Sequence, residues 1–361
     1  MALPACPPVV ARTVAGLPAA IDAAADAAPP ERRFLRRHWY AAALEAYGGA
    51  ARTVVVARGD RTVAALPLVA LGPKVLGLAQ VPGSYWPFRS MPLAQEAAAG
   101  DVDALLAAAG RAVRGFRLGP VHDDDPAVVA LLAAAARAGW RAIPRHVAES
   151  YVLDMAALRA GGPWPRASTA KSIRYQEKQL AAEGALDWTF VTGAAWTPDI
   201  FEALADIERA SWISARTDGR DAKFTATGHG AFWRAAARDP AIAATIRAAI
   251  LRVDGTAAAF SFDLDAGTMK YVVANSYDPR FARHSPGKLL YYRNLAEALA
   301  RGIDRVDWGA GDSGYKRVTG AEPGPAIRDW LFLRPGLPAW AGRWIAPRWR
   351  ASGHAPVAAA D

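Results

Sequence analysis

Each half of the chain carries the sequence signal of a β-hairpin, which is two apolar, β-branched runs joined by a tight turn. Residues 52–58 and 61–68 flank a Gly-Asp pair in the first half. Residues 246–252 and 257–263 flank an Asp-Gly pair in the second half. A hairpin in each half commits the chain to antiparallel sheet at two separate places.

The elements that follow each hairpin come in the same order, namely a third strand, a helix and a fourth strand. In the first half we expect them at residues 74–80, 102–114 and 116–119, and in the second half at residues 268–275, 285–301 and 305–308. The fourth strand reads "FRLG" in one half and "VDWG" in the other. This repeated order predicts one α/β fold used twice.

The length of the chain, 361 residues, is enough for two ordinary domains. We place them at residues 31–150 and 151–335, between a loose Ala/Pro-rich segment at 1–30 and a basic, Trp-containing tail at 336–361. In that tail Trp340, Trp344 and Trp349 lie among arginines, which suits a membrane interface, but the prolines favour a packing strand or a loose tail.

Composition excludes several classes of protein. The net charge of +9 favours anionic partners such as phosphates, nucleotides, RNA or acidic lipid. The single cysteine and the six scattered histidines predict neither a disulfide framework nor a metal site. No uninterrupted apolar run is long enough for a transmembrane helix, and residues 1–30 lack the pattern of a signal peptide, so we expect a cytoplasmic protein.

The stretch "YDPRFARHSPGKLL", residues 277–290, joins the third strand to the helix of the second half. Ser285 suits an N-cap, Pro286 suits the first helical position, and Gly287 leaves the backbone open. Free N–H groups and the helix dipole make such an end an anion site, to which Arg283 and Lys288 would add charge. The alternative is a well-capped helix with ordinary surface cations.

Residues 309–314 spell the GxGxxG pattern of a dinucleotide site, but no long helix follows and too little chain remains for the rest of that fold. We interpret this stretch as a glycine-lined loop at the end of a strand. It would bring Asp312, Tyr315 and Lys316 to a site, with Tyr315 returning a proton and Lys316 holding a phosphate or an oxyanion. The alternative is a tight turn with solvated charges.

Glu208 and Trp212 lie four residues apart on one helix face. An indole beside a carboxylate lowers its hydration, which raises the pKa of the acid towards that of a general base. A surface acid paired with an arginine is the alternative interpretation. Lys171, Arg174 and Lys178 share one face of another helix, where they would meet acceptor phosphates or an acidic glycan, or form a solvated face.

The second half resembles the GNAT acyltransferase superfamily, more specifically its FemAB-like branch and, within it, the CelD-like acetyltransferase-domain proteins. The resemblance is carried by "IERASW", "YDPRFARHSPGKLL", "ARGIDRVDWGAGDSGYK" and "KSIRYQEKQL". It implies tandem GNAT-like domains, each a mixed, mostly antiparallel sheet flanked by helices. The first half resembles the degenerate N-terminal unit of such proteins.

The resemblance also implies an N-acyltransferase that takes an acyl group, acetyl first, from acyl-CoA and delivers it to an amine, with a setting in cell-envelope polysaccharide or lipid synthesis. Glu208, Tyr315 and Asp312 would be catalytic, and Trp212, Lys171, Arg174 and Lys316 would contact the acceptor. The cofactor would lie on the helix start and the strand before it: Asn275, Arg283, His284, Ser285, Pro286, Gly287 and Lys288.

The sequence departs from the general GNAT pattern, because the Gln/Arg-x-x-Gly-x-Gly/Ala phosphate loop is missing. FemAB-like relatives take their acyl group from aminoacyl-tRNA, so a tRNA donor is the first alternative, and it suits a basic chain. A protein without catalytic activity that holds an anionic polymer on its basic face is the second alternative.

Overall fold

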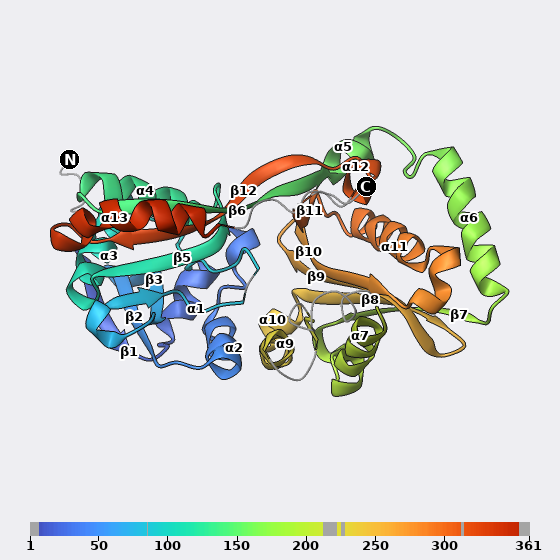
Figure 1. Ribbon diagram of the computed structural model, residues 1–361, viewed down its shortest axis with the longest axis horizontal. Helices are drawn as coiled ribbons and strands as arrows, with labels where there is room; N and C mark the ends of the chain where they lie inside the picture. The colour runs from blue at the N-terminus through green and yellow to red at the C-terminus, as the bar shows by residue number, and fades with distance from the viewer. Residues whose placement is uncertain (1–6, 85, 212–221, 225–227, 312–313, 354–361) are drawn as a thin grey trace, which may run out of the picture. The chain divides into compact units, whose positions relative to one another are not determined.

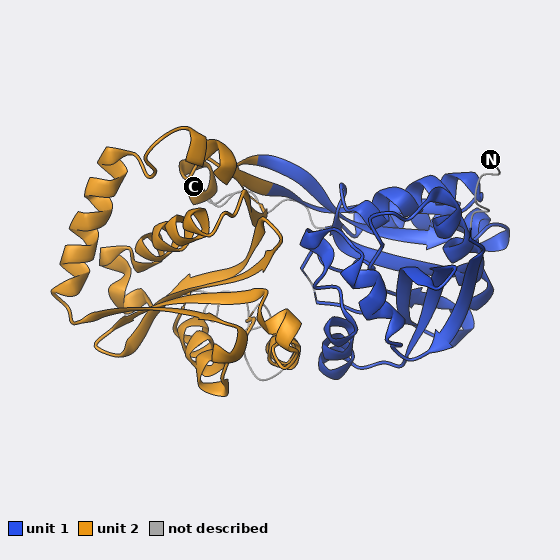
Figure 2. Ribbon diagram, turned by 180° about the vertical axis from the view of Figure 1, so that it is seen from behind, with its two compact units in different colours: residues 1–150, 323–361 blue, residues 151–322 orange. Residues whose placement is uncertain are grey.

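The computed structural model describes residues 7–84, 86–211, 222–224, 228–311 and 314–353. The chain divides into two compact units, shown in Figure 2. Unit 1 consists of residues 1–150 and 323–361, and unit 2 consists of residues 151–322. The last strand and the last helix, which the sequence placed with or after the second half, therefore belong to the first unit.

Unit 1 contains both strands and helices (Figure 1). Its elements are β1 (Val9–Ala15), α1 (Ala20–Asp26), α2 (Arg37–Tyr47), β2 (Ala51–Arg58), β3 (Arg61–Ala70), β4 (Leu78–Gln80), α3 (Ala99–Ala112), β5 (Gly115–His122), α4 (Pro126–Arg137), β6 (Arg141–Asp154) as far as Ser150, β12 (Glu322–Leu333) from Pro323 on, and α13 (Leu337–Ala351). Strands β1 to β4 pair antiparallel in sequence order, β4 pairs parallel with β5, and β5 pairs antiparallel with β12.

The two ends of unit 1 differ from the sequence expectation. The expected loose segment at residues 1–30 is wrong, because β1 pairs with β2 over its whole length and α1 buries Ile21, Ala24 and Ala25. The expected strand or loose tail after residue 336 is also wrong. Helix α13 begins with a proline in its first turn, where a missing N–H costs nothing, and it continues past Pro347.

Unit 2 contains the elements of the second half. They are α5 (Met155–Ala160), α6 (Ala167–Ala181), β7 (Leu186–Thr192), α7 (Pro198–Ala210), α9 (His229–Ala236), α10 (Pro240–Ala243), β8 (Ile246–Val253), β9 (Thr256–Ala266), β10 (Met269–Tyr277), α11 (Pro286–Ala300), β11 (Arg305–Ala310) and α12 (Tyr315–Val318). Strands β7 to β10 pair antiparallel in sequence order. Helix α11 connects β10 to β11, and these two strands pair parallel.

The two faces of the unit 2 sheet carry different helices, with α11 on one face and α7 and α9 on the other (Figure 1). Successive side chains of β9 point alternately towards these two faces of the sheet. Phe260 and Phe262 meet the aromatic ring of Phe224, and Phe262 also meets Trp233 of α9. Ser261 and Asp263 lie on the opposite face and bond to Asn294 of α11.

Both units thus use the same order of elements. A hairpin, a third strand, a connecting helix and a parallel fourth strand occur as β2–β3–β4–α3–β5 and again as β8–β9–β10–α11–β11. Each unit is a mixed, mostly antiparallel sheet flanked by helices, so the expected tandem fold is confirmed. Among the described residues, no helix combines the length and the apolar character that crossing a bilayer requires.

Candidate functional site

Strands β10 and β11 pair over a short distance and then separate. Their parallel register covers Met269–Tyr271 against Arg305–Asp307. A bulge between Val272 and Ala274 interrupts the pairing of β10 with β9, and bulges bend the strand that carries them. Within the described part of the chain, no strand pairs with the β11-facing edge of β10 beyond Tyr271. Among the described residues, the backbone N–H and C=O groups of this edge have no strand partner, which suits the binding of an extended ligand.

Aromatic side chains line the β11 side of this opening. Tyr315 of α12 stacks on Tyr291 of α11, with ring centroids 5.8 Å apart, and it meets the ring of Trp308 edge-on at 5.5 Å. Across the opening, Asn275 of β10 donates a hydrogen bond from Nδ2 to the Tyr315 hydroxyl at 3.1 Å. The structure therefore brings together Asn275 and Tyr315, which the sequence assigned to the cofactor and to proton transfer.

Helix α11 begins at Pro286, directly after a 3-10 helix at Pro279–His284. Ser285 occupies the N-cap position but adopts the left-handed conformation, and its side chain caps no backbone group. The expected side-chain cap is therefore wrong. Since Pro286 has no N–H, the first free donors of the helix are the N–H groups of Gly287 and Lys288.

Gly287 has a neighbour that explains its missing side chain. A Cβ at this position would lie 3.2 Å from Cδ1 of Tyr277, which is closer than side chains normally approach. The glycine allows the last residue of β10 to pack against the first turn of α11. This packing places the open strand edge beside the free N–H groups of the helix.

Arg283 and His284 are partly engaged by a neighbouring acid. Arg283 forms an ion pair with Glu183, His284 Nε2 lies 3.3 Å from the same carboxylate, and Arg283 Nε donates to His284 Nε2 at 2.9 Å. Glu183 follows α6, so these contacts tie the end of that helix to the loop before α11. Lys288 is half-buried and has no ion pair within the described ranges.

Lys316 has a different role from the expected one. Its side chain is buried, and its ammonium group donates to the carbonyl oxygens of Gly309, Ala310 and Gly311 at 3.2, 2.9 and 2.6 Å. Three carbonyl acceptors use the donors that a phosphate or oxyanion would need. The prediction that Lys316 binds such a group is therefore wrong, and the lysine instead holds the glycine loop.

Glu208 lies near the end of α7 and is 1% exposed. Its Oε2 accepts hydrogen bonds from the backbone N–H groups of Lys223 and Phe224, at 2.7 and 2.9 Å. Its Oε1 is buried and has no hydrogen-bond partner among the described residues. Burial raises the pKa of Glu208 despite the opposing effect of Lys223 and of the two amides. One carboxylate oxygen thus remains available to take a proton.

The remaining predicted site residues are Trp212, Asp312, Lys171 and Arg174. Trp212 and Asp312 lie outside the described residues. Lys171 and Arg174 are exposed on α6, which packs beside α11 and the 3-10 turn before it. Within the described chain, no cluster of three or more His, Cys, Asp or Glu side chains could hold a metal ion.

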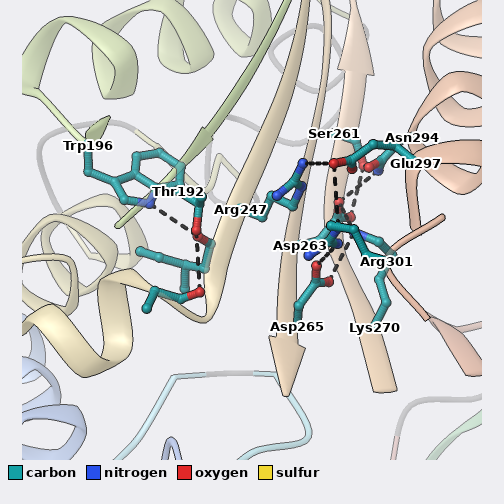
Figure 3. Close-up of polar contacts among 12 residues, drawn as sticks. Thr192, Trp196, Arg247, Ser261, Asp263, Asp265, Lys270, Asn294, Glu297 and Arg301 are labelled. Atoms are coloured by element: carbon teal, nitrogen blue, oxygen red, sulfur yellow. Dashed lines mark hydrogen bonds and ion pairs between the residues drawn. The ribbon is translucent and has the colours of Figure 1, made fainter. Parts of the chain in front are cut away.

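A buried ionic cluster beneath α11 was not found by sequence reasoning (Figure 3). The Lys270 ammonium lies 2.8 Å from Asp263 and 3.0 Å from Asp265, and neither Lys270 nor Asp263 is exposed. Asn294 of α11 donates to Asp263 at 2.7 Å, and Arg301 pairs with Asp265. The available signal was the alternation of Ser261, Asp263 and Asp265 within an otherwise apolar strand. The cluster fixes the C-terminal half of α11, whose other end forms the candidate site.

Comparisons with known proteins identify a domain family in this part of the chain. The acetyltransferase (GNAT) domain family matches residues 167–317, which contain the separated strands, α11 and the loop of Lys316. A search of the curated proteins gives no match.

Two solved structures share the fold over nearly the whole chain. FemX is 11% identical, covers 90% of this chain and 97% of its own, and has a TM-score of 0.60. The C-terminal domain (DUF2156) of a protein described as a lysylphosphatidylglycerol synthetase from Agrobacterium fabrum is 16% identical, covers 94% of this chain and 98% of its own, and has a TM-score of 0.52. The C-terminal half of this chain therefore carries a GNAT domain.

Proposed function

We propose that unit 2 transfers an acyl group, acetyl first, from acyl-CoA to an amine. The observation that carries the proposal is the open edge of β10, which leads directly to the free N–H groups at the start of α11. An extended thioester arm needs backbone partners along its length, and a pyrophosphate needs donors at one end. This part of unit 2 offers the backbone groups of β10 for the arm and, after them along the chain, the N–H donors of α11 for the pyrophosphate.

In this proposal the pyrophosphate binds the N–H groups of Gly287 and Lys288, where the helix dipole favours negative charge. The Lys288 side chain adds one positive charge. Arg283 adds a second when it leaves Glu183, which is a modest cost because the arginine is 69% exposed and surface pairs are weak. Asn275 and Tyr315 lie beside the thioester end of the arm.

The proposed chemistry is direct transfer. The neutral amine attacks the thioester carbonyl, a C–N bond forms, and the C–S bond breaks as the thiolate leaves. Backbone N–H groups of β10 stabilise the negative charge on the carbonyl oxygen. Glu208 takes the proton that the amine loses, directly or through water, and Tyr315 gives a proton to the departing sulfur. Asp312 and Trp212 stay candidates for catalysis and acceptor binding.

The acceptor in this proposal is an amine on a sugar, a lipid headgroup or an amino acid, in cell-envelope synthesis. One structure with the same fold is described as a lysylphosphatidylglycerol synthetase, which supports a lipid among these acceptors. Lys171 and Arg174, exposed on α6, would contact its phosphate or acidic groups. Reversing their charges should then raise KM for the acceptor and leave acyl-CoA binding unchanged.

A tRNA-dependent aminoacyl transfer is the second candidate. Two observations favour it: the usual phosphate loop of GNAT proteins is missing from the sequence, and in the nearest substitute, residues 283–288, Arg283 is paired with Glu183. A basic chain also favours RNA. In this case ribonuclease treatment of the donor preparation would abolish activity, whereas acyl-CoA transfer would be insensitive to it.

The test is calorimetric titration of the purified protein with acetyl-CoA, longer acyl-CoAs and free CoA, repeated with Gly287→Asp and Gly287→Ala. The aspartate places negative charge at the helix start, while the alanine adds only the Cβ that would crowd Tyr277. We expect binding by the wild type, loss of binding in Gly287→Asp, and a smaller loss in Gly287→Ala.

Two results would contradict the first candidate. One is a folded wild-type protein that binds no CoA species, which would transfer the proposal to charged tRNA as donor. The other is equal weakening by the alanine and the aspartate, because the effect would then be steric and the pyrophosphate would lie elsewhere.

A further inference from the structure

A cavity lies in unit 1, and none of its lining residues belongs to the proposed acyltransferase site. Its volume is about 170 Å³, and it is formed where α2, β3 and β4 end. The lining is partly apolar, with Ala43, Val69 and Pro82, and partly polar, with Tyr47, Gln80 and Arg89.

Arg89 is the cationic group of this cavity, and its position is fixed by the fold. Its Nε donates to the carbonyl oxygens of Gly83 and Ser84, both at 2.9 Å. Its backbone N–H donates to Pro120 at 3.2 Å, and its carbonyl oxygen accepts from Gly119 at 2.9 Å. These bonds use Nε and the main chain, and among the described residues the two terminal nitrogens of the guanidinium have no hydrogen-bond partner, while Arg89 lines the cavity.

Gly83 is required for this arrangement. A Cβ on Gly83 would lie 2.7 Å from Cγ of Arg89, so only glycine lets the arginine side chain pass at this point. The loop is therefore shaped around the arginine, which argues against a chance surface orientation.

The charges near Arg89 do not balance. Asp329 accepts two bonds from Arg117, at 3.0 and 2.9 Å, and it also pairs with Arg145. Asp329 is therefore shared by two arginines before Arg89 is considered, and Arg89 itself has no ion pair with a carboxylate in the described ranges. A partly buried guanidinium without a counter-charge costs free energy, which an anion would recover.

The protonation states suit an anion as well. Burial, and next the charge of Arg117, lower the pKa of Arg89 to about 10, which keeps it charged at neutral pH. Burial raises the pKa of Tyr47 to about 12, so its hydroxyl remains neutral at neutral pH. The lining of the cavity thus includes a guanidinium and a hydroxyl together with apolar side chains.

We propose that this cavity binds a small organic anion, whose carboxylate or phosphate group pairs with the terminal nitrogens of Arg89 while its apolar part contacts Ala43, Val69 and Pro82. The planar fork of arginine matches both kinds of group. The site is independent of the acyl-transfer chemistry, because every lining residue belongs to unit 1.

The test uses inorganic phosphate and acetate as probes for the two groups, added to the full-length protein in thermal-shift titrations against potassium chloride at equal ionic strength. A ligand of the native state raises Tm in a saturable way. We expect this behaviour from at least one probe, and the stronger probe identifies phosphate or carboxylate as the preferred group. Equal effects of both probes and chloride would overturn the proposal.

Arg89→Gln removes the charge and should weaken the effective probe by about tenfold or more, as expected for the loss of a charge-assisted bond. Arg343→Gln removes one charge from an exposed position on α13 and is the matched control. Unchanged saturation in Arg89→Gln, or an equal loss in the control, would contradict the assignment.

A second pair of variants keeps the test valid if Arg89→Gln fails to fold. Ala70 lines the cavity and is exposed, so a substitution there spares the core. Ala70→Asp supplies a carboxylate that repels the probe and pairs with Arg89, whereas Ala70→Asn has the same shape without the charge. We expect the aspartate alone to abolish the saturable effect. Binding that survives in Ala70→Asp would overturn the proposal.

Discussion

Two buried charged side chains of unit 2, Glu208 and Lys316, differ in the partners that the fold gives them. Lys316 is surrounded by three carbonyl oxygens, which complete its hydrogen bonds. Glu208 has one satisfied oxygen and one without a partner among the described residues. The sequence suggested chemistry for both residues, because residue type and spacing are visible there. The partners are not visible, since the carbonyl groups around Lys316 belong to a loop whose path only the fold defines.

Glu208→Gln is expected to lower kcat by about a hundredfold or more, the usual range for a lost general base, with little change in KM. The amide oxygen of glutamine can still accept the bonds from Lys223 and Phe224, so the fold should survive. Glu202→Gln, an exposed carboxylate on the same helix, is the control and should retain activity. A glutamine variant at position 208 with wild-type kcat would exclude the proposed base.

The pH profile gives an independent check on Glu208. A base must be deprotonated, so kcat falls as the pH decreases through the pKa of Glu208. Because burial raises this pKa, the fall should occur above the range of an ordinary glutamate, which titrates near about 4.3. A wild-type profile that stays flat down to that ordinary range would contradict the assignment.

At the scale of elements, helix α11 meets two kinds of surface along its length. Its first half packs Leu289 and Leu290 on apolar residues of β8 and β9, and its second half closes over the cluster of Lys270, Asp263 and Asp265. Hydrophobic contacts would let the helix shift along the sheet, whereas the ion pairs and hydrogen bonds of the cluster form at only one position of the helix. We attribute the fixed position of the helix start to the ionic end of the helix.

Lys270→Met is expected to destabilise unit 2 by about 3–5 kcal/mol, because it leaves the buried carboxylate of Asp263 without a cation, while Asp265 keeps only Arg301. Urea unfolding would measure this loss. Lys178→Met, at an exposed position on α6, should change stability by less than about 0.5 kcal/mol. A loss at position 270 no larger than that of the control would show that the cluster is not stabilising.

The same variant should show a defined pH dependence. Burial alone would raise the pKa of Asp265, but the charges of Lys270 and Arg301 outweigh it and lower this pKa. The ionised aspartate therefore contributes stability above its unfolded pKa of about 3.9, and this contribution is lost as the pH falls through the folded value. The difference in the free energy of unfolding between the wild type and Lys270→Met should therefore become smaller in acid. A gap that is constant between pH 7 and pH 3 would contradict this account.

The elements that the sequence predicted well are those defined by local signals. Both hairpins follow from their two-residue turns, and β7 follows from its apolar run. Strand β1 was missed because it is largely exposed and is stabilised by pairing with β2, a contact distant in sequence. Helix α13 was missed because Pro347 argued against it, although Gly342 and Ala346 pack on unit 1.

At the scale of the whole molecule, the chain order and the spatial units do not coincide. Unit 2 is one continuous segment, whereas unit 1 needs residues from both ends of the chain. Strand β12 pairs with β5, and its Asp329 holds Arg117 and Arg145. The sequence assigned β12 to the second half because it follows that half directly. A strand belongs to the unit that contains the strand with which it pairs. When the two strands are far apart in sequence, no local sequence pattern shows that they pair.

A chain that ends after residue 322 tests this organisation. We expect unit 2 to stay folded and unit 1 to unfold, because β5 loses its neighbour and two arginines lose Asp329. Limited proteolysis should then digest residues 1–150 and spare residues 151–322. A separate peptide of residues 323–361, added during refolding, should restore the protection. Equal resistance of both units in the shortened chain would contradict the shared role of β12.

The divided unit 1 has a consequence for how the protein is made. A ribosome releases residues 1–150 first, but β5 has no β12 to pair with until Leu333 has left the exit tunnel. At ordinary elongation rates that delay is on the order of ten seconds or more. During it the nascent chain presents an unpaired strand edge, the kind of surface on which polypeptides aggregate. Unit 2, inserted in between, can finish folding first, so the part of the protein synthesised earliest is completed last.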